Sequence, residues 1–256
     1  MHTKKLLCCI TGLVLSISTS YADTYVAKDN CQYFDKNFVR KVPTDEVVIV
    51  LDQSEALSSS HAEQIIQIVD EYIVSNEMVP VGGRVSFYRF GKDDFKSNGD
   101  GQTIKPEISL CKPAAEGNAL YQNNRKINKK FQSTFFDPIK NVITNSVGVA
   151  YGERSPILEM VKYLTSLPAF SDDKVKSRKM ILISDLLQHS DSVSSYKKKY
   201  KVPDYLISNM AGWDLNVLQL QRYGRDRPLQ SESDIGLWKS YFTNSSVRSL
   251  NLQLIP

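Results

Sequence analysis

Hydrophobic positions follow two periods along the chain, and this predicts alternating strands and helices. Residues 46–52 (EVVIVLD) are almost continuously apolar and rich in β-branched side chains, which is typical of a strand buried on both faces. The next stretch places apolar residues at helical spacing: Ile65, Ile66, Val69, Ile73 and Val74. We expect Ser60 and Glu63 to form a capping box at the start of this helix.

The rest of the chain continues this alternation. Further strands are predicted in 81–91, 107–111, 178–185, 214–222 and 249–256, and helices in 119–145, 152–167 and 231–244. Pro138 interrupts the first of these helices, and Ser155 followed by Pro156 is typical of an N-cap and a first helical residue. Strands that alternate with helices predict an α/β fold around a mainly parallel sheet.

The first 22 residues have the composition of a secretory signal peptide. Lys4 and Lys5 precede an apolar run at 6–19, and small residues stand at Ser20 and Ala22. We expect cleavage after Ala22, an N-terminal extension over 23–45, and one domain over 46–256. The predicted location is therefore periplasmic or secreted, with no transmembrane span in the mature chain. An uncleaved N-terminal anchor is the alternative, but the apolar run is short for a membrane span.

Two cysteines, Cys31 and Cys111, follow the predicted signal peptide. An even number of cysteines in an exported chain favours a disulfide, and this one would close a loop of about eighty residues. Two buried free thiols are the alternative. Neither cysteine has the second ligand pair that a zinc site requires.

The charge of the chain argues against nucleic acid as a partner. The sequence has 32 Lys and Arg against 28 Asp and Glu. Loss of Lys4 and Lys5 with the signal peptide leaves 30 against 28, a net charge of +2. The basic run at 195–201 (SYKKKYK) is interpreted as solvated, because no basic stripe with interleaved aromatic residues accompanies it.

Two acidic residues end the two most apolar strands, and they are the main candidates for chemistry. Asp52 and Asp185 would meet where ligands bind in open parallel sheets, beyond the carboxyl ends of the central strands. Two carboxylates in one crevice call for a cation or a proton. Ser54 and Ser155 could add neutral oxygen ligands, a set that suits Mg²⁺.

Each of these residues also has a purely structural interpretation. Asp52 could accept hydrogen bonds from the amides of the following helix, Ser155 could serve only as an N-cap, and Asp185 could simply shape its loop. His189 follows Asp185 by four residues, and we expect it to be solvent-exposed rather than part of the crevice.

With Asp52-Gln53-Ser54 after the first strand, Ser155 before a later helix and Asp185 in LISDLLQ, the chain resembles the von Willebrand factor type A (integrin I-like) domains. The resemblance implies a three-layer α/β/α sandwich with one short antiparallel edge strand. It also implies a metal-ion-dependent adhesion site at Asp52, Ser54, Ser155 and Asp185, holding Mg²⁺ or another divalent cation. Ala56 stands where the motif has its second Ser, and so removes one oxygen ligand.

Three functions follow as expectations. The resemblance implies a non-catalytic exported module that docks an unknown protein partner. A Mg²⁺-dependent phosphohydrolase of the haloacid-dehalogenase type, with Asp52 as nucleophile, is the first alternative. That chemistry needs a second Asp two residues later, where this chain has Ser54. The second alternative is a structural accessory protein of a cell-envelope assembly.

Overall fold

The structure is a computed structural model that describes most of the chain from residue 33 onward. The described residues are 33–34, 40–41, 43–75, 78–91, 104–114, 123–152, 154–197 and 200–256. The predicted signal peptide and Cys31 lie outside them. Two short strands, β1 (Tyr33–Phe34) and β2 (Arg40–Lys41), pair antiparallel before the main domain.

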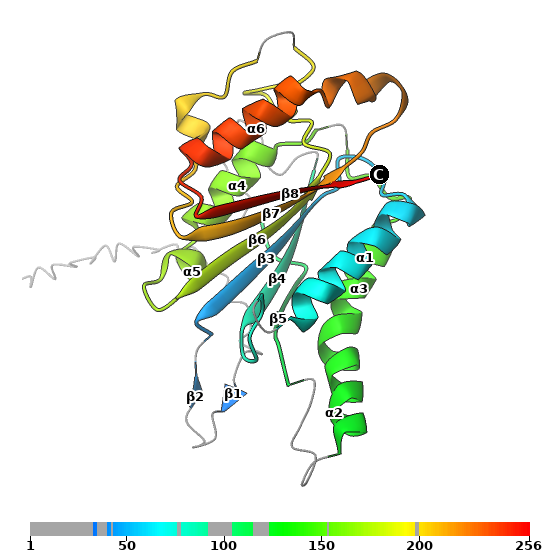
Figure 1. Ribbon diagram of the computed structural model, residues 1–256, viewed down its shortest axis with the longest axis vertical. Helices are drawn as coiled ribbons and strands as arrows, with labels where there is room; N and C mark the ends of the chain where they lie inside the picture. The colour runs from blue at the N-terminus through cyan, green and yellow to red at the C-terminus, as the bar shows by residue number, and fades with distance from the viewer. Residues whose placement is uncertain are drawn as a thin grey trace, which may run out of the picture.

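A six-stranded sheet in the order β5-β4-β3-β6-β7-β8 forms the centre of the domain (Figure 1). Its strands are β3 (Asp45–Asp52), β4 (Arg84–Phe90), β5 (Ile108–Cys111), β6 (Ser177–Ser184), β7 (Trp213–Leu220) and β8 (Ser249–Ile255). All neighbours are parallel except β5, which runs antiparallel to β4 at one edge. The expected mainly parallel sheet with one antiparallel edge strand is confirmed.

The chain changes direction across the sheet between β3 and β6. From β3 it builds outward through β4 to β5, and from β6 it builds outward on the other side through β7 to β8. The pairing of Leu51 with Ile183 places Asp52 beside Ser184 at the carboxyl ends of these two strands. This is the position at which open α/β sheets bind ligands.

Helices cover both faces of the sheet (Figure 1). One face carries α1 (Ser59–Val74), α2 (Asn124–Phe131) and α3 (Asp137–Thr144), and the other carries α4 (Ile157–Ser166), α5 (Pro168–Ser171) and α6 (Glu232–Asn244). Along β3, Ile49 packs toward the α1 face and Val50 toward the α4 face, as the alternation of a strand requires. The three-layer α/β/α sandwich is therefore confirmed.

Pro138 alters its helix without ending it. A π-helical turn, η1 (Gln132–Phe136), joins α2 to α3, and Pro138 lies in the first turn of α3. Phe131, directly before this turn, and Phe135, within it, are fully buried. The helix therefore continues through the predicted interruption, and the wider hydrogen-bonding pattern is confined to the turn that precedes Pro138.

Two predicted helix starts are wrong. The N-cap of α1 is Ser58, whose side chain accepts a hydrogen bond from the amide of His61 at 3.0 Å, so Ser60 and Glu63 do not form the expected box. Pro156 is the N-cap of α4, without a side-chain hydrogen bond. Ser155 lies one residue earlier and makes a different contact, described below.

Two short 3₁₀ helices, η2 (Asp204–Leu206) and η3 (Gly224–Leu229), complete the described elements. Among the helices of the described residues, none has the length and apolar character needed to cross a membrane.

Candidate functional site

The four residues predicted from the sequence come together at the carboxyl ends of β3 and β6. Asp52 ends β3, and Ser54 follows it by two residues. Asp185 follows β6 directly, and Ser155 immediately precedes the N-cap of α4. All four are buried, with at most 8% of each residue exposed.

Asp52 is held by hydrogen bonds from three serines. Its Oδ2 atom accepts from the hydroxyls of Ser155 at 2.5 Å and Ser184 at 2.7 Å, and its Oδ1 atom accepts from the backbone amide of Ser54 at 3.0 Å. The three serines thus take the place of the α1 amides that were one expected partner. Ser184 was not predicted, although its place before Asp185 in a strand paired with β3 puts it beside Asp52.

Asp185 shapes its loop and also forms an ion pair. Its Oδ1 atom accepts from the amide of Leu187 at 2.8 Å, and its Oδ2 atom accepts from Nε of Arg222 at 2.5 Å. Nη2 of the same guanidinium lies 2.5 Å from that oxygen. Burial, and then the charge of Asp52, raise the pKa of Asp185 above its ordinary value, while the guanidinium favours the charged carboxylate.

Arg222 is a central residue of the candidate site that sequence reasoning missed. The pattern at 214–222 predicted a strand through Arg222, but β7 ends at Leu220, and Arg222 turns back over β6. Its Nη1 atom forms an ion pair with Glu55. The side chain of Arg222 is 19% exposed, whereas that of Glu55 is 50% exposed. The edge of the guanidinium that contacts Asp185 is therefore buried, and the end that contacts Glu55 lies near solvent.

Gln230 fixes the position of Arg222. Its Nε2 atom donates to the carbonyls of Asp185 at 2.7 Å and Leu220 at 2.8 Å, and its Oε1 atom accepts from the amide of Arg222 at 2.7 Å. One side chain therefore joins the ends of β6 and β7. Nothing in the local sequence distinguishes Gln230 from other loop residues.

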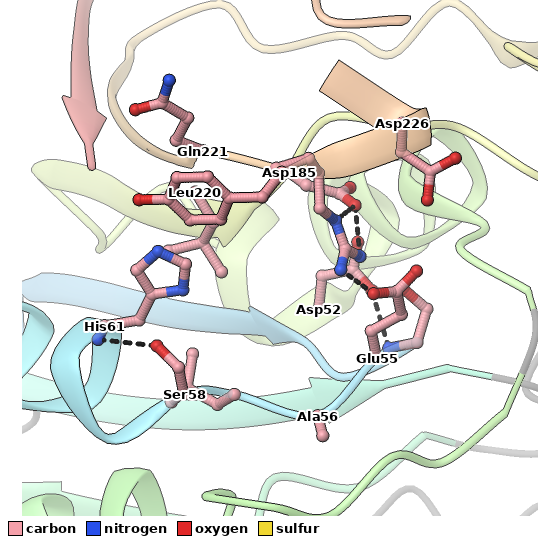
Figure 2. Close-up of a pocket in the computed structure, with 13 residues that line it drawn as sticks. Asp52, Glu55, Ala56, Ser58, His61, Asp185, Leu220, Gln221 and Asp226 are labelled. Atoms are coloured by element: carbon pink, nitrogen blue, oxygen red, sulfur yellow. Dashed lines mark hydrogen bonds and ion pairs between the residues drawn. The ribbon is translucent and has the colours of Figure 1, made fainter.

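Two pockets open beside the ion pair, and both are lined by Ser54, Glu55, Asp185 and Arg222. The first has a volume of about 320 Å³ and also contains Asp52, His61, Tyr223 and Asp226 in its lining. Figure 2 shows Asp52, Glu55 and Asp185 grouped in one part of it, with His61 in another. The second has a volume of about 400 Å³ and extends past Ser155, His189 and Tyr196.

His189 was expected to be solvent-exposed, and that prediction is wrong. The residue is half-buried in the lining of the second pocket. Its Nδ1 atom lies 3.0 Å from the hydroxyl of Ser194, and its ring packs edge-on against Tyr196 with centroids 5.4 Å apart. These contacts hold the loop after β6 over the pocket.

Half-exposed tyrosines surround this end of the sheet. Tyr196 is 49% exposed and Tyr223 is 65% exposed, one in each pocket lining. Tyr151 is 47% exposed, and its amide donates to the carbonyl of Gln53, just beyond β3, at 2.8 Å. The guanidinium of Arg89 lies 5.0 Å from the centre of the Tyr151 ring. Large aromatic surfaces therefore face solvent around a charged centre.

The metal site at Asp52, Ser54, Ser155 and Asp185 stays a prediction. In the arrangement seen here, these side chains fit a divalent ion poorly. The oxygens of both carboxylates accept hydrogen bonds from protein groups, and Arg222 already supplies a positive charge to Asp185. In the part of the chain that the structure describes, no three His, Cys, Asp or Glu side chains gather as metal ligands. Ala56, which is exposed in the first pocket, adds no oxygen.

The partner of Cys111 in the expected disulfide also stays a prediction. Cys111, the last residue of β5, is disulfide-bonded. Its expected partner, Cys31, lies outside the described residues.

Comparison with protein-family models and with curated proteins gives no match. Among solved structures, the chain is similar to an aerotolerance-related membrane protein from Bacteroides fragilis, with 12% identity over 82% of this chain and 90% of that one, at a TM-score of 0.43. It is also similar to the open conformation of the pilus adhesin SpaC from Lactobacillus rhamnosus, with 13% identity over 83% of this chain and 28% of the adhesin, at a TM-score of 0.42. At this level of similarity we draw no functional conclusion from either structure.

Proposed function

We propose that this protein is a non-catalytic protein-binding module of the von Willebrand factor type A kind, which docks its partner at the carboxyl edge of the sheet. One observation carries the proposal: Tyr196 and Tyr223 expose large aromatic surfaces in the two pocket linings that also contain the pair of Arg222 and Asp185. Tyrosine and arginine are enriched at the centres of protein interfaces, where rigid aromatic anchors contribute much of the affinity.

The fold and the motif support the type A assignment. The sheet has the single antiparallel edge strand, β5, that the resemblance implies. Asp52 and Ser54 also follow the first strand of the domain in the order that the resemblance requires, with Asp185 after the neighbouring strand β6.

The surroundings of Asp52 disfavour the phosphohydrolase alternative. A carboxylate nucleophile needs an oxygen that can reach the phosphorus atom. Asp52 is only 7% exposed, and both of its oxygens accept hydrogen bonds. The hydroxyl of Ser155 donates a hydrogen bond to Asp52, while Nδ1 of His189 lies beside the hydroxyl of Ser194, so these groups are not arranged as a serine hydrolase triad.

The experiment is a capture from cell-envelope extract with the immobilised protein and two variants. Tyr196→Ala with Tyr223→Ala removes aromatic surface from both pocket rims, and we expect this double variant to lose the captured protein. Tyr205→Ala is the matched control, since Tyr205 is 60% exposed but belongs to η2, away from the strand ends. Equal capture of the same protein by the double variant, or no capture by the unaltered protein, would contradict the proposal.

A further inference from the structure

The charge distribution of the two pockets is uneven. Among the residues described as lining them, four are acidic, namely Asp52, Glu55, Asp185 and Asp226, and Arg222 is the only lysine or arginine. The acidic groups therefore depend on one guanidinium for an opposite charge. That guanidinium contacts two of them directly.

The two contacts of Arg222 differ in their access to solvent. Toward the protein, Nε and Nη2 meet Asp185, whose side chain is 4% exposed. Toward the surface, Nη1 meets Glu55, whose side chain is 50% exposed. Breaking a buried ion pair is costly, whereas an exposed pair contributes little and exchanges readily. The outer partner of Arg222 can thus be replaced while the inner partner holds it in place.

Arg222 is also preorganised for such a replacement. Gln230 binds its backbone amide at 2.7 Å, and Asp185 binds its side chain, so little further ordering is needed when a ligand arrives. The planar guanidinium suits a carboxylate, which it can bind through two parallel N–H groups. A carboxylate that replaces Glu55 takes over its contact with the guanidinium, while the side chain of Glu55, already 50% exposed, turns into solvent, where its charge is screened.

We propose that Arg222 takes the place of the divalent ion at this edge of the sheet, and that an aspartate or glutamate side chain of the partner protein binds it by displacing Glu55. Glu55 then acts as an internal substitute for the ligand and keeps Arg222 paired in the free protein. Tyr196 and Tyr223, on either side of the ion pair, would pack against the residues that flank the acidic side chain. This inference rests on the proposed function and adds a metal-independent mode of recognition.

The test follows the Nε–Hε signal of Arg222 by NMR in the ¹⁵N-labelled protein. The probe is a blocked pentapeptide with a central aspartate between glycines, and its control carries asparagine instead. We expect the aspartate peptide, and not the asparagine peptide, to shift the signal, with or without EDTA.

Glu55→Gln should increase the affinity for the aspartate peptide about two- to fivefold, which corresponds to loss of one exposed competing pair. Asp214→Asn, which removes the partner of Arg248 at the amino end of β7, should leave it unchanged.

A second arm uses Mn²⁺ alone as a paramagnetic probe. We expect no selective broadening of the amides of Ser54, Ser155 and Leu187 in the unaltered protein. Selective broadening there would show that an ion binds between Asp52 and Asp185, and would overturn the inference. An equal response to the asparagine peptide, or a weaker response in Glu55→Gln, would also overturn it.

Two further results separate this inference from the proposed function. Arg222→Gln lacks the Nε–Hε group, so it is followed through the backbone amide signal of Glu55, which the aspartate peptide should shift in the unaltered protein but not in this variant. The variant also leaves Asp185 without its cation, so Glu55→Gln, at the exposed end, keeps the inference testable if Arg222→Gln unfolds. Partner capture that needs Tyr196 and Tyr223 but disappears in EDTA would refute the role of Arg222 while the docking function stands. Capture that is insensitive to the tyrosines would refute the docking function itself.

Discussion

The hydroxyl of Ser155 donates a hydrogen bond of 2.5 Å to Oδ2 of Asp52, and these two residues lie 103 positions apart in the chain. It ties the segment before α4 to the end of β3, in a place where both residues are buried. A buried carboxylate needs such donors, because burial without hydrogen bonds would strongly disfavour its charge. The hydroxyl therefore serves the strand-end site instead of capping α4.

Ser155→Ala is expected to lower the free energy of unfolding by about 2 kcal/mol, because it removes a hydrogen bond to a buried charged group. Urea denaturation checks this value. Ser166→Ala, at the end of α4, is the control, since its hydroxyl donates to the carbonyl of Tyr163 at an exposed position, and its effect should stay within about 0.5 kcal/mol. Similar losses in both variants would contradict the role assigned to Ser155.

The pair of Arg222 and Asp185 is expected to be strongly coupled. Arg222→Met and Asp185→Asn should each cost about 3–5 kcal/mol, because each leaves a buried charge without its partner. The double variant should cost at least about 2 kcal/mol less than their sum. The same double-mutant cycle on Arg248 and Asp214, where Arg248 is 50% exposed, should give a coupling below about 1 kcal/mol. Additive costs at the first pair would refute its direct interaction.

Gln230→Ala is expected to loosen the loop that carries Arg222. The variant loses the hydrogen bonds to Asp185, Leu220 and Arg222, and should be less stable by about 2–3 kcal/mol. Hydrogen exchange gives the more specific readout, because the amide of Arg222 should exchange faster than the amides in the middle of β7. An unchanged exchange rate at Arg222 would show that Gln230 does not hold the loop.

Lys112 is expected to make stability depend on pH in the alkaline range. Its Nζ atom donates to the carbonyls of Val79 at 2.8 Å and Val74 at 2.9 Å. Burial lowers its pKa from 10.5 to about 8. Between these values the unfolded chain binds more protons than the folded one, so the free energy of unfolding should rise as the pH increases from about 8 to about 10.5.

Comparison with Lys112→Met isolates this contribution from the other groups that titrate in the same range. Urea denaturation at about pH 7.5 and about pH 10 should show the unaltered protein gaining about 2 kcal/mol relative to the variant. A difference that stays constant, or that shifts the other way, would contradict the lowered pKa.

The sequence by itself determined the layers of this protein and one half of its candidate site. Residues 46–52 and 178–185 were recognisable as strands because a strand buried on both faces must be apolar throughout. Their terminal acids, Asp52 and Asp185, were then expected at one edge, because parallel strands end together. These features are local patterns, and the sheet order β5-β4-β3-β6-β7-β8 brings them together as expected.

Only the tertiary structure decided what those acids contact. The roles of Arg222 and Gln230 depend on how the loop after β7 folds back over β6, and neither residue belongs to a periodic pattern. Ser155 looked like a helix cap because its neighbour Pro156 suits a helix start, but the fold places its hydroxyl beside the buried carboxylate of Asp52. The partner of a side chain is set by the groups that surround it in space. A hydrogen bond from the serine hydroxyl to a buried charged carboxylate is stronger than one that the hydroxyl accepts from a neutral amide at a helix end.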